Sequence, residues 1–323
     1  NKPKQLRHLH CSRFARLGCK ALPSDISLHI YSVIPAPTAS TMPATSATPH
    51  ISCLFEELPA THTASGEPLR MARLTLRHAG KFNAMSYAMW GQLRSLCEEL
   101  QAQTHAAQPL RCVLIEGADG HFCAGADIAE FPSFRFDAQS LRHFHEEVVW
   151  PALAAVLALD CPVIAAIDGH CMGAGLEVAC CCDIRIGTVA SRYGAPIAKL
   201  GFPMAPHETA LLTRVLGETC TRSILLEAAV YPAAEMLQRG LLTRTVADAA
   251  ALQAECQLTI ERIGTLGPAS ARLNKHTLRA LQAPAAHAAA PHVVNAFDPY
   301  AYANSAEHRE GITAFLEKRP PRF

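Results

Sequence analysis

Residues 162–177 have the sequence PVIAAIDGHCMGAGLE, and this stretch decides the fold. Residues 163–167 form a short, uninterrupted apolar run, as expected for a strand that is buried on both faces. Asp168 and Gly169 end this strand, and the small residues of 174–182 predict a helix directly after a glycine-rich turn. A buried strand, a glycine-rich turn and a helix in this order indicate an α/β protein.

A second glycine-rich turn, GADGHFCAGADI at residues 117–128, follows another apolar run at residues 111–115. Strands that end in small residues leave backbone N–H groups uncovered at the carboxyl edge of a sheet, where open α/β sheets bind ligands. Two such N–H groups that converge on one oxygen atom would form an oxyanion hole. The alternative is the dinucleotide fingerprint G-x-G-x-x-G. Val178 at its third glycine, and Tyr193 where its ribose-binding acid belongs, argue against that alternative.

The flanking patterns extend the α/β arrangement. Residues 70–76 alternate like a strand, residues 86–100 repeat apolar side chains at helical spacing behind the capping residue Ser86, residues 136–159 are mostly helical, and residues 183–186 predict another strand. Short buried strands that alternate with helices predict largely parallel pairing. Strand signals fade after Leu237, so we expect a core over residues 51–245 and a helical C-terminal region over residues 246–323.

Composition excludes several classes of protein. The 323 residues carry a net charge of +1, so charge gives no reason to expect a nucleic acid or an anionic membrane as partner. No apolar stretch is long enough to span a membrane. The 13 cysteines are scattered and form no C-x-x-C pair, which favours reduced packing cysteines in a reducing, cytoplasmic compartment and predicts no metal site.

Residues 1–50 differ from the rest of the chain. Their charged side chains are six lysines and arginines and one acid, Asp25, and their second half is rich in Ser, Thr and Pro. Such a composition does not support a packed element, so we interpret this segment as a disordered or non-native extension. The alternative is an organelle transit peptide, which would place the protein in the mitochondrial matrix.

Four motifs together resemble the signatures of the crotonase superfamily (enoyl-CoA hydratase/isomerase). FCAGADI at residues 122–128 matches that family's first turn, and PVIAAIDGHCMGAGLE is similar to its second turn. KFNAM at residues 81–85 and EGITAFLEKR at residues 310–319 resemble its segments near the start and the end of the domain. The four occur in the family's order and cover residues 69–323.

The resemblance implies a spiral core of ββα units followed by a helical trimerisation region. It implies an acyl-CoA substrate of fatty-acid or related catabolism, no cofactor beyond the coenzyme A that the substrate carries, and a homotrimer or hexamer. The thioester oxygen would accept from the backbone N–H groups of Ala126 and Ala174, and Glu177 would be the catalytic acid/base. The substrate-binding positions would be Lys81, Ala124, Asp127, Ile128 and Ile197.

Some of these assignments have structural alternatives. Lys81 is equally well explained as a solvated turn lysine, and Asp127 as the cap of the next helix. Ala174 stands where the family has glycine, which a backbone donor tolerates if the φ of Ala174 is negative. Cys123 and Cys171 lie near the turns but lack the partners of a nucleophilic thiol. Asp183 and Arg185 are interpreted as structural, in a buried pair.

The sequence departs from the hydratase pattern at Ile197, where the family has its second catalytic glutamate. An isoleucine moves no proton, so either Glu177 does single-carboxyl chemistry, such as isomerisation, or another residue substitutes. Glu208, which follows His207 just beyond this loop, is one candidate; the alternative is a helix-start glutamate beside an exposed histidine. Other hypotheses are a decarboxylase or hydrolase of the same fold, a silent acyl-CoA-binding subunit, and a nicotinamide-dependent dehydrogenase.

Overall fold

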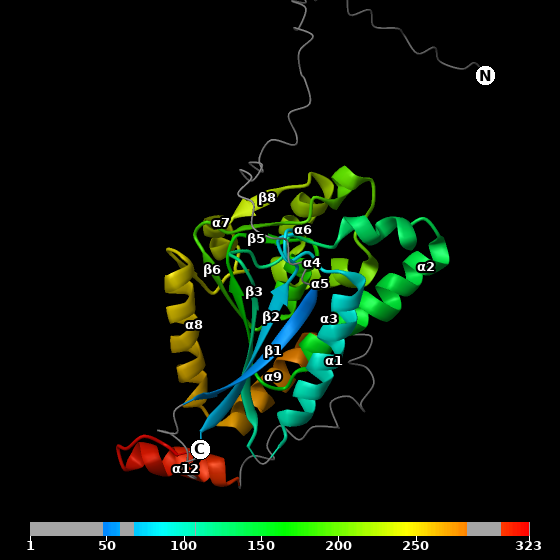
Figure 1. Ribbon diagram of the computed structural model, residues 1–323. Helices are drawn as coiled ribbons and strands as arrows, with labels where there is room; N and C mark the ends of the chain where they lie inside the picture. Colours follow the sequence, from blue (N-terminus) through cyan, green and yellow to red (C-terminus); the bar gives the residue numbers. More distant parts are fainter. Residues whose placement is uncertain (1–47, 59–67, 107, 283–304, 323) are drawn as a thin grey trace, which may run out of the picture. The chain divides into compact units, whose positions relative to one another are not determined.

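The computed structural model describes residues 48–58, 68–106, 108–282 and 305–322. Its main sheet has the strand order β1-β2-β3-β4-β6-β9 (Figure 1). The strands of this sheet are β1 (His50–Leu58), β2 (Leu69–Arg77), β3 (Leu110–Gly117), β4 (Val163–Ile167), β6 (Ile184–Thr188) and β9 (Arg244–Val246). Only β1 pairs antiparallel, and the parallel pairing that the sequence predicts is confirmed for the other five.

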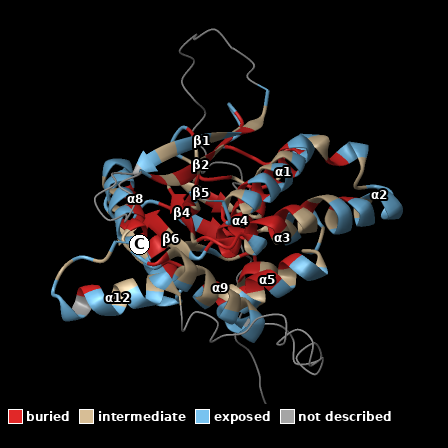
Figure 2. Cartoon of the chain, turned by 90° about the horizontal axis from the view of Figure 1, so that it is seen from below, coloured by how far each residue is buried: buried red, intermediate tan, exposed pale blue. Residues whose placement is uncertain are grey.

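Helices cover both faces of this sheet. The helices α1 (Tyr87–Gln103), α3 (Trp150–Ala158) and α4 (Ala174–Cys181) share one buried cluster with every second strand residue, including Val163 and Ala165. The alternate residues, including Ile164 and Ala166, pack against α8 (Ala249–Gly264) on the opposite face. The strands are therefore apolar on both sides, which explains their uninterrupted apolar runs. Figure 2 shows the buried residues concentrated between α8 and the α1, α3 and α4 layer.

A second, three-stranded sheet builds the repeating ββα unit. Its order is β5-β7-β8, with β5 (His170–Met172), β7 (Arg192–Gly194) and β8 (Val230–Pro232). The chain runs from β4 in the large sheet to β5 in the small sheet and then into α4, and β6 to β7 repeats the first part of that path. The α/β spiral implied by the sequence motifs is confirmed.

The remaining helical segments connect these units. They are η1 (Ile128–Ser133), α2 (Ala138–His143), η2 (Phe144–Val149), η3 (Ile197–Leu200), α5 (Pro206–Leu216), α6 (Glu218–Leu226), α7 (Ala233–Gln238), α9 (Pro268–Gln282) and α12 (Ala306–Leu316). β9 lies beyond Leu237, where the sequence suggested helices only. Among the described residues, no helix is long and apolar enough to cross a membrane.

The expected pair of Asp183 with Arg185 is wrong. Asp183 accepts from Lys275 of α9 at 2.6 Å, and it also accepts from the N–H of Val163. Arg185 donates instead to carbonyl oxygens at the C-terminal end of α4, including that of Cys182. The negative C-terminal end of a helix attracts a guanidinium. The local sequence predicts neither the partner of Asp183 nor that of Arg185.

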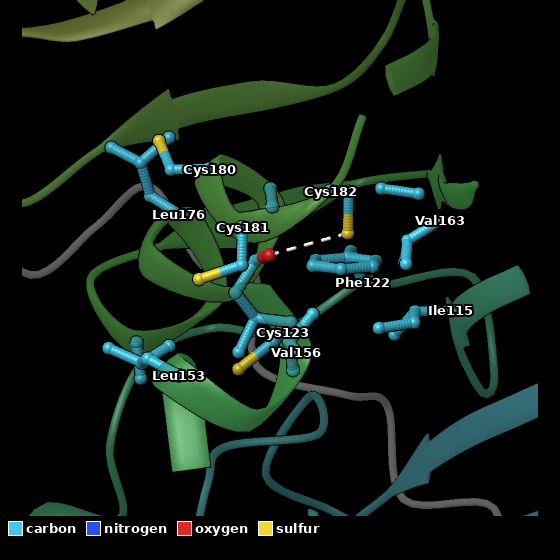
Figure 3. Close-up of a cluster of buried hydrophobic side chains, with 14 of the residues drawn as sticks. Ile115, Phe122, Cys123, Leu153, Val156, Val163, Leu176, Cys180, Cys181 and Cys182 are labelled. Atoms are coloured by element: carbon cyan, nitrogen blue, oxygen red, sulfur yellow. Dashed lines mark hydrogen bonds between the residues drawn. The ribbon is translucent and has the colours of Figure 1, made fainter. Parts of the chain in front are cut away.

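Cysteines fill the core, as expected. All eleven cysteines of the described residues are free thiols, and ten of them are buried. Figure 3 shows Cys123 and the run from Cys180 to Cys182 among apolar side chains, with the Sγ of Cys182 donating to the carbonyl oxygen of Val178 at 3.4 Å. Burial raises the pKa of the Cys180 thiol to about 12, so these thiols stay protonated.

Candidate active site

Two glycine-rich turns, one after β3 and the other around β5, are tied together by backbone hydrogen bonds. The N–H of Cys123 donates to the carbonyl oxygen of His170 at 2.8 Å, and the N–H of Met172 donates back to Cys123 at 2.9 Å. The turns also touch, since a Cβ added to Gly173 would lie 3.6 Å from the Cα of Gly125. The residues that directly precede Ala126 and Ala174 are therefore in contact.

Ala126 and Ala174 each present an unused backbone donor. Among the residues that the structure describes, neither N–H group donates a hydrogen bond, although the N–H groups beside them do. That of Asp127 donates to Met85, and that of Gly173 donates to Gly194, each at 2.8 Å. Ala174 is buried and Ala126 is half-buried. Backbone donors away from water are rarely left unpaired in proteins, so these two donors on touching turns indicate a site for an acceptor from a ligand.

The conformation of Gly173 starts the helix behind the second donor. Gly173 has φ +47°, which favours glycine, and Ala174 follows it as the first residue of α4. Ala174 is not among the residues with positive φ, so the condition for an alanine at this position is met. Its N–H therefore belongs to the positive end of α4, which favours negative charge on a nearby acceptor.

Glu177 lies one helical turn beyond Ala174 and is buried, with 9% of its surface exposed. Burial raises the pKa of its carboxyl group from 4.5 to about 8, and the charge of Glu208 adds to the shift. In the described part of the chain, no side chain donates a hydrogen bond to this carboxyl. Glu177 is thus an unpartnered carboxyl group whose pKa is close to neutral pH, as a general acid/base requires.

Glu208 is the second buried carboxyl group of this region, at 2% exposure in the first turn of α5. Its Oε1 lies 3.0 Å from Nδ1 of His145 in η2. The Nε2 of His145 in turn lies 3.4 Å from Nη1 of Arg135. Glu208 begins a helix and His207 beside it is exposed, as the structural alternative expected, but that alternative does not account for the burial of the carboxyl.

Lys81 and Asp127, two of the predicted substrate-binding residues, form an ion pair with each other. The Nζ of Lys81 donates to both oxygens of Asp127, at 2.8 and 2.6 Å. Asp127 also accepts from the N–H of Ala129 and so caps η1. Ile128 is 52% exposed, and the N–H of Ala124 donates to the carbonyl of Phe82. Ile128 is therefore accessible beside the first donor.

Ile197 begins η3 with a half-buried side chain and brings no titratable group. The two cysteines near the turns are not activated as nucleophiles. Burial raises the pKa of the Cys123 thiol to about 12, and it raises the pKa of Cys171 well above its ordinary value.

An open pocket of about 390 Å³ lies beside this region, lined by Tyr87, Phe134, Gln139, Ser140 and His143. The rings of Phe134 and Phe144 are 4.4 Å apart, and the ring of Phe144 is 5.2 Å from that of His145. His145 was not predicted from the sequence. It lies inside a helical stretch far from Glu208 in the sequence, and no motif marks it.

Comparisons with known proteins agree on one family. A family model described as enoyl-CoA hydratase/isomerase matches residues 68–323. A relative from Mycobacterium bovis, described as a probable enoyl-CoA hydratase, is 29% identical over 256 residues, which cover 79% of this chain and 94% of the relative. The 2,3-dehydroadipyl-CoA hydratase of Escherichia coli is 29% identical over 254 residues, which cover 79% of this chain and 95% of that protein.

Solved structures give the same picture. The crystal structure of an enoyl-CoA hydratase/carnithine racemase from Magnetospirillum magneticum matches with a TM-score of 0.70 and 33% sequence identity. The match covers 79% of this chain and 94% of that one.

Proposed function

Since the chain belongs to the enoyl-CoA hydratase/isomerase family, we propose that it converts an enoyl-CoA thioester through an enolate. The N–H groups of Ala126 and Ala174 hold the thioester oxygen, and Glu177 moves a proton at the adjacent carbons. The observation that carries this proposal is the pair of unused donors on touching turns, with a buried carboxyl group one helical turn away.

The two donors supply electrostatic stabilisation where it is needed. Enolate formation places negative charge on the thioester oxygen, and fixed donors in a dry site stabilise that charge without reorganising. Removing one such donor costs about 3–4 kcal/mol of transition-state stabilisation in well-studied enzymes. The positive end of α4 adds to the same effect, because Ala174 is its first residue.

The protonation of Glu177 fits proton transfer at carbon. With a pKa of about 8, roughly nine-tenths of the Glu177 carboxyls carry a proton at pH 7. A protonated carboxyl delivers its proton as the enolate collapses, and the resulting carboxylate recovers a proton from substrate or water. Both hydration of a 2-enoyl thioester and isomerisation of a 3-enoyl thioester use such a group.

The residues around the first donor, together with Ile197, bind the substrate. Ala124, Asp127 and Ile128 surround the first donor, and Ile128 is exposed for contact with the coenzyme A portion. Lys81 acts by fixing Asp127, with its half-exposed ammonium at the rim. The half-buried Ile197 contributes an apolar contact.

We also propose that the protein is a homo-oligomer, a trimer or hexamer. The C-terminal helices expose large apolar side chains, including Leu258, Leu278 and Ile312, and such side chains are favoured at interfaces between subunits. Size-exclusion chromatography with light scattering would test this, and a monomer would contradict it.

An absorbance assay tests the activity. Purified protein is added to a short trans-2-enoyl-CoA, in which hydration removes the conjugated enoyl-thioester band, and to a 3-enoyl-CoA, in which isomerisation creates that band. We expect one of these changes, and we expect Glu177→Gln to lower its rate at least ~100-fold. The matched control is Glu218→Gln, because Glu218 also occupies a first helical turn but is exposed. Tight binding of both thioesters with no change in either band would instead indicate a silent binding subunit.

A further inference from the structure

Glu208 is buried without a cation to neutralise it. Burying an ionised carboxylate costs several kcal/mol unless charge or hydrogen bonds compensate. In the described part of the chain, the partner of this carboxyl is His145, through Oε1, and no side chain donates to Oε2. If Glu208 had only a structural role, an apolar side chain would fill its position equally well.

The bond with His145 has a definite direction. A guanidinium only donates hydrogen bonds, so Nε2 of His145 accepts from Arg135, and Nδ1 therefore carries the hydrogen that Oε1 of Glu208 accepts. Arg135 is itself fixed, with its guanidinium carbon 4.6 Å from the ring centre of Phe131 and 4.0 Å from that of Phe202. The chain from Arg135 through His145 thus presents a hydrogen-bond donor to Oε1 of Glu208.

Glu208 also lies near Glu177. Helix α5, which carries Glu208, packs against α4, which carries Glu177. The charge of Glu208 contributes to the raised pKa of Glu177, so the two carboxyls interact electrostatically. The two carboxyls have different surroundings, since Glu208 accepts from His145 whereas no described side chain donates to Glu177. Paired carboxyls in different surroundings are typical of an acid and a base in one active site.

We propose that Glu208, held by His145, is the catalytic base of a carboxyl pair whose acid is Glu177. This inference rests on the proposed function. It supplies the second carboxyl group that position 197 lacks, from a different helix.

The proton balance closes for isomerisation of a 3-enoyl thioester. Glu208 removes a proton from the α carbon, and the electrons of that C–H bond move into the thioester, whose oxygen accepts from Ala126 and Ala174. The enolate then takes the proton of Glu177 at its γ carbon, which leaves a 2-enoyl thioester. Glu208 is now protonated and Glu177 ionised, and transfer of one proton between them restores the pair.

The first test is kinetic. We expect Glu208→Gln to lower kcat at least ~100-fold at every pH and to leave KM within about threefold, because glutamine still accepts from His145 but is not a base. Glu218→Gln is the matched control, and thermal unfolding verifies that each variant folds. An unchanged kcat would overturn the proposal. So would a kcat that returns to the wild-type value at lower pH, since Glu208 would then only set the protonation of Glu177.

Isotope labelling distinguishes a pair of carboxyls from one carboxyl that both removes and returns the proton. A 3-enoyl-CoA with two deuterium atoms on its α carbon is converted for a single turnover in ordinary water, and the product is weighed by mass spectrometry. A single carboxyl returns the deuterium it removed, so the product keeps both deuterium atoms. The pair delivers a proton from Glu177, so we expect one deuterium atom to be lost. Retention of both would overturn the proposal.

His145 is a positioning residue in this scheme, and its variants test that role. His145→Gln retains both a donor for Glu208 and an acceptor for Arg135, whereas His145→Leu retains neither. We expect a large loss of kcat in the leucine variant and its rescue in the glutamine variant. Equal activity of the two variants would contradict the role.

Infrared spectroscopy without substrate distinguishes a failure of the proposed function from a failure of the proposed carboxyl pair. If the wild-type protein converts neither thioester, the proposed function fails. The infrared difference spectrum between wild type and Glu208→Gln at neutral pH then decides the state of Glu208. A protonated Glu208 would overturn the inference, because a carboxylic acid is not a base. An ionised Glu208 beside a protonated Glu177 would support the pair for another acyl-CoA reaction.

Discussion

Replacing Glu177 by glutamine should stabilise the folded protein, and the gain should grow with pH. The substitution keeps the size of the side chain and removes the charge that burial disfavours. The folded protein binds the proton of this carboxyl more tightly than the unfolded chain does, because the pKa is raised from 4.5 to about 8. Stability of the wild type is therefore lost as pH rises from the lower value to the higher one.

The magnitude follows from the size of the shift. Each pKa unit corresponds to about 1.4 kcal/mol, so the wild type loses about 3 kcal/mol by pH 7 and about 5 kcal/mol above pH 8. The glutamine variant does not titrate here. Its free energy of unfolding should match that of the wild type near pH 4.5 and exceed it by these amounts at higher pH.

Urea unfolding at equal protein concentration, measured at several pH values between about 5 and 9, gives the difference directly. Glu218→Gln is again the control, since an exposed carboxyl should produce no such trend. A difference that stays constant across pH would refute the reasoning, and so would a glutamine variant that is less stable at pH 8. Either result would mean that Glu177 is not desolvated in the folded state.

Two further substitutions and one control variant test the architecture. In Gly175→Ala the new Cβ would meet the carbonyl oxygen of Cys123 at 2.5 Å and push the two turns apart, so we expect kcat/KM for the enoyl thioester to fall ~100-fold or more. Gly91→Ala, in α1 with open space around its Cα, should leave turnover unchanged and raise stability by about 1 kcal/mol. Lys275→Met removes the buried partner of Asp183 and should lower the free energy of unfolding by about 1–3 kcal/mol, measured in urea; no loss would contradict that pairing.

Elements with a strong local pattern could be predicted from the sequence. β2 has an alternating pattern, β3 and β4 have uninterrupted apolar runs, and α4 has a stretch of small residues. Their predicted positions agree with the structure to within about two residues. The strands β5, β7, β8 and β9 were not predicted, because each has only three residues and shows no periodicity. Their pairing with distant partners fixes them.

The site residues also divide into those that a local sequence pattern predicts and those that it does not. Ala126, Ala174 and Glu177 were named from sequence because the two glycine-rich turns resemble motifs of a known family, and those motifs are local features. The burial of Glu208 and its bond to His145 depend on how α5 packs against α4 and η2, which no local pattern reports. The wrong pairing of Asp183 has the same cause, since Lys275 comes from a helix near the end of the chain.

The hydrogen bonds between Cys123 and β5 have a consequence for how such proteins diverge. They join the two turns directly, although η1, α2, η2, α3 and β4 all lie between them in the sequence. The segment from η1 to η2 lies outside these hydrogen bonds, so we expect a change of length there to leave the contact between the two turns in place. The intervening segment also contributes Phe134, Gln139, Ser140 and His143 to the open pocket. The lining of this pocket can therefore change among related proteins while the contact between the two turns is kept.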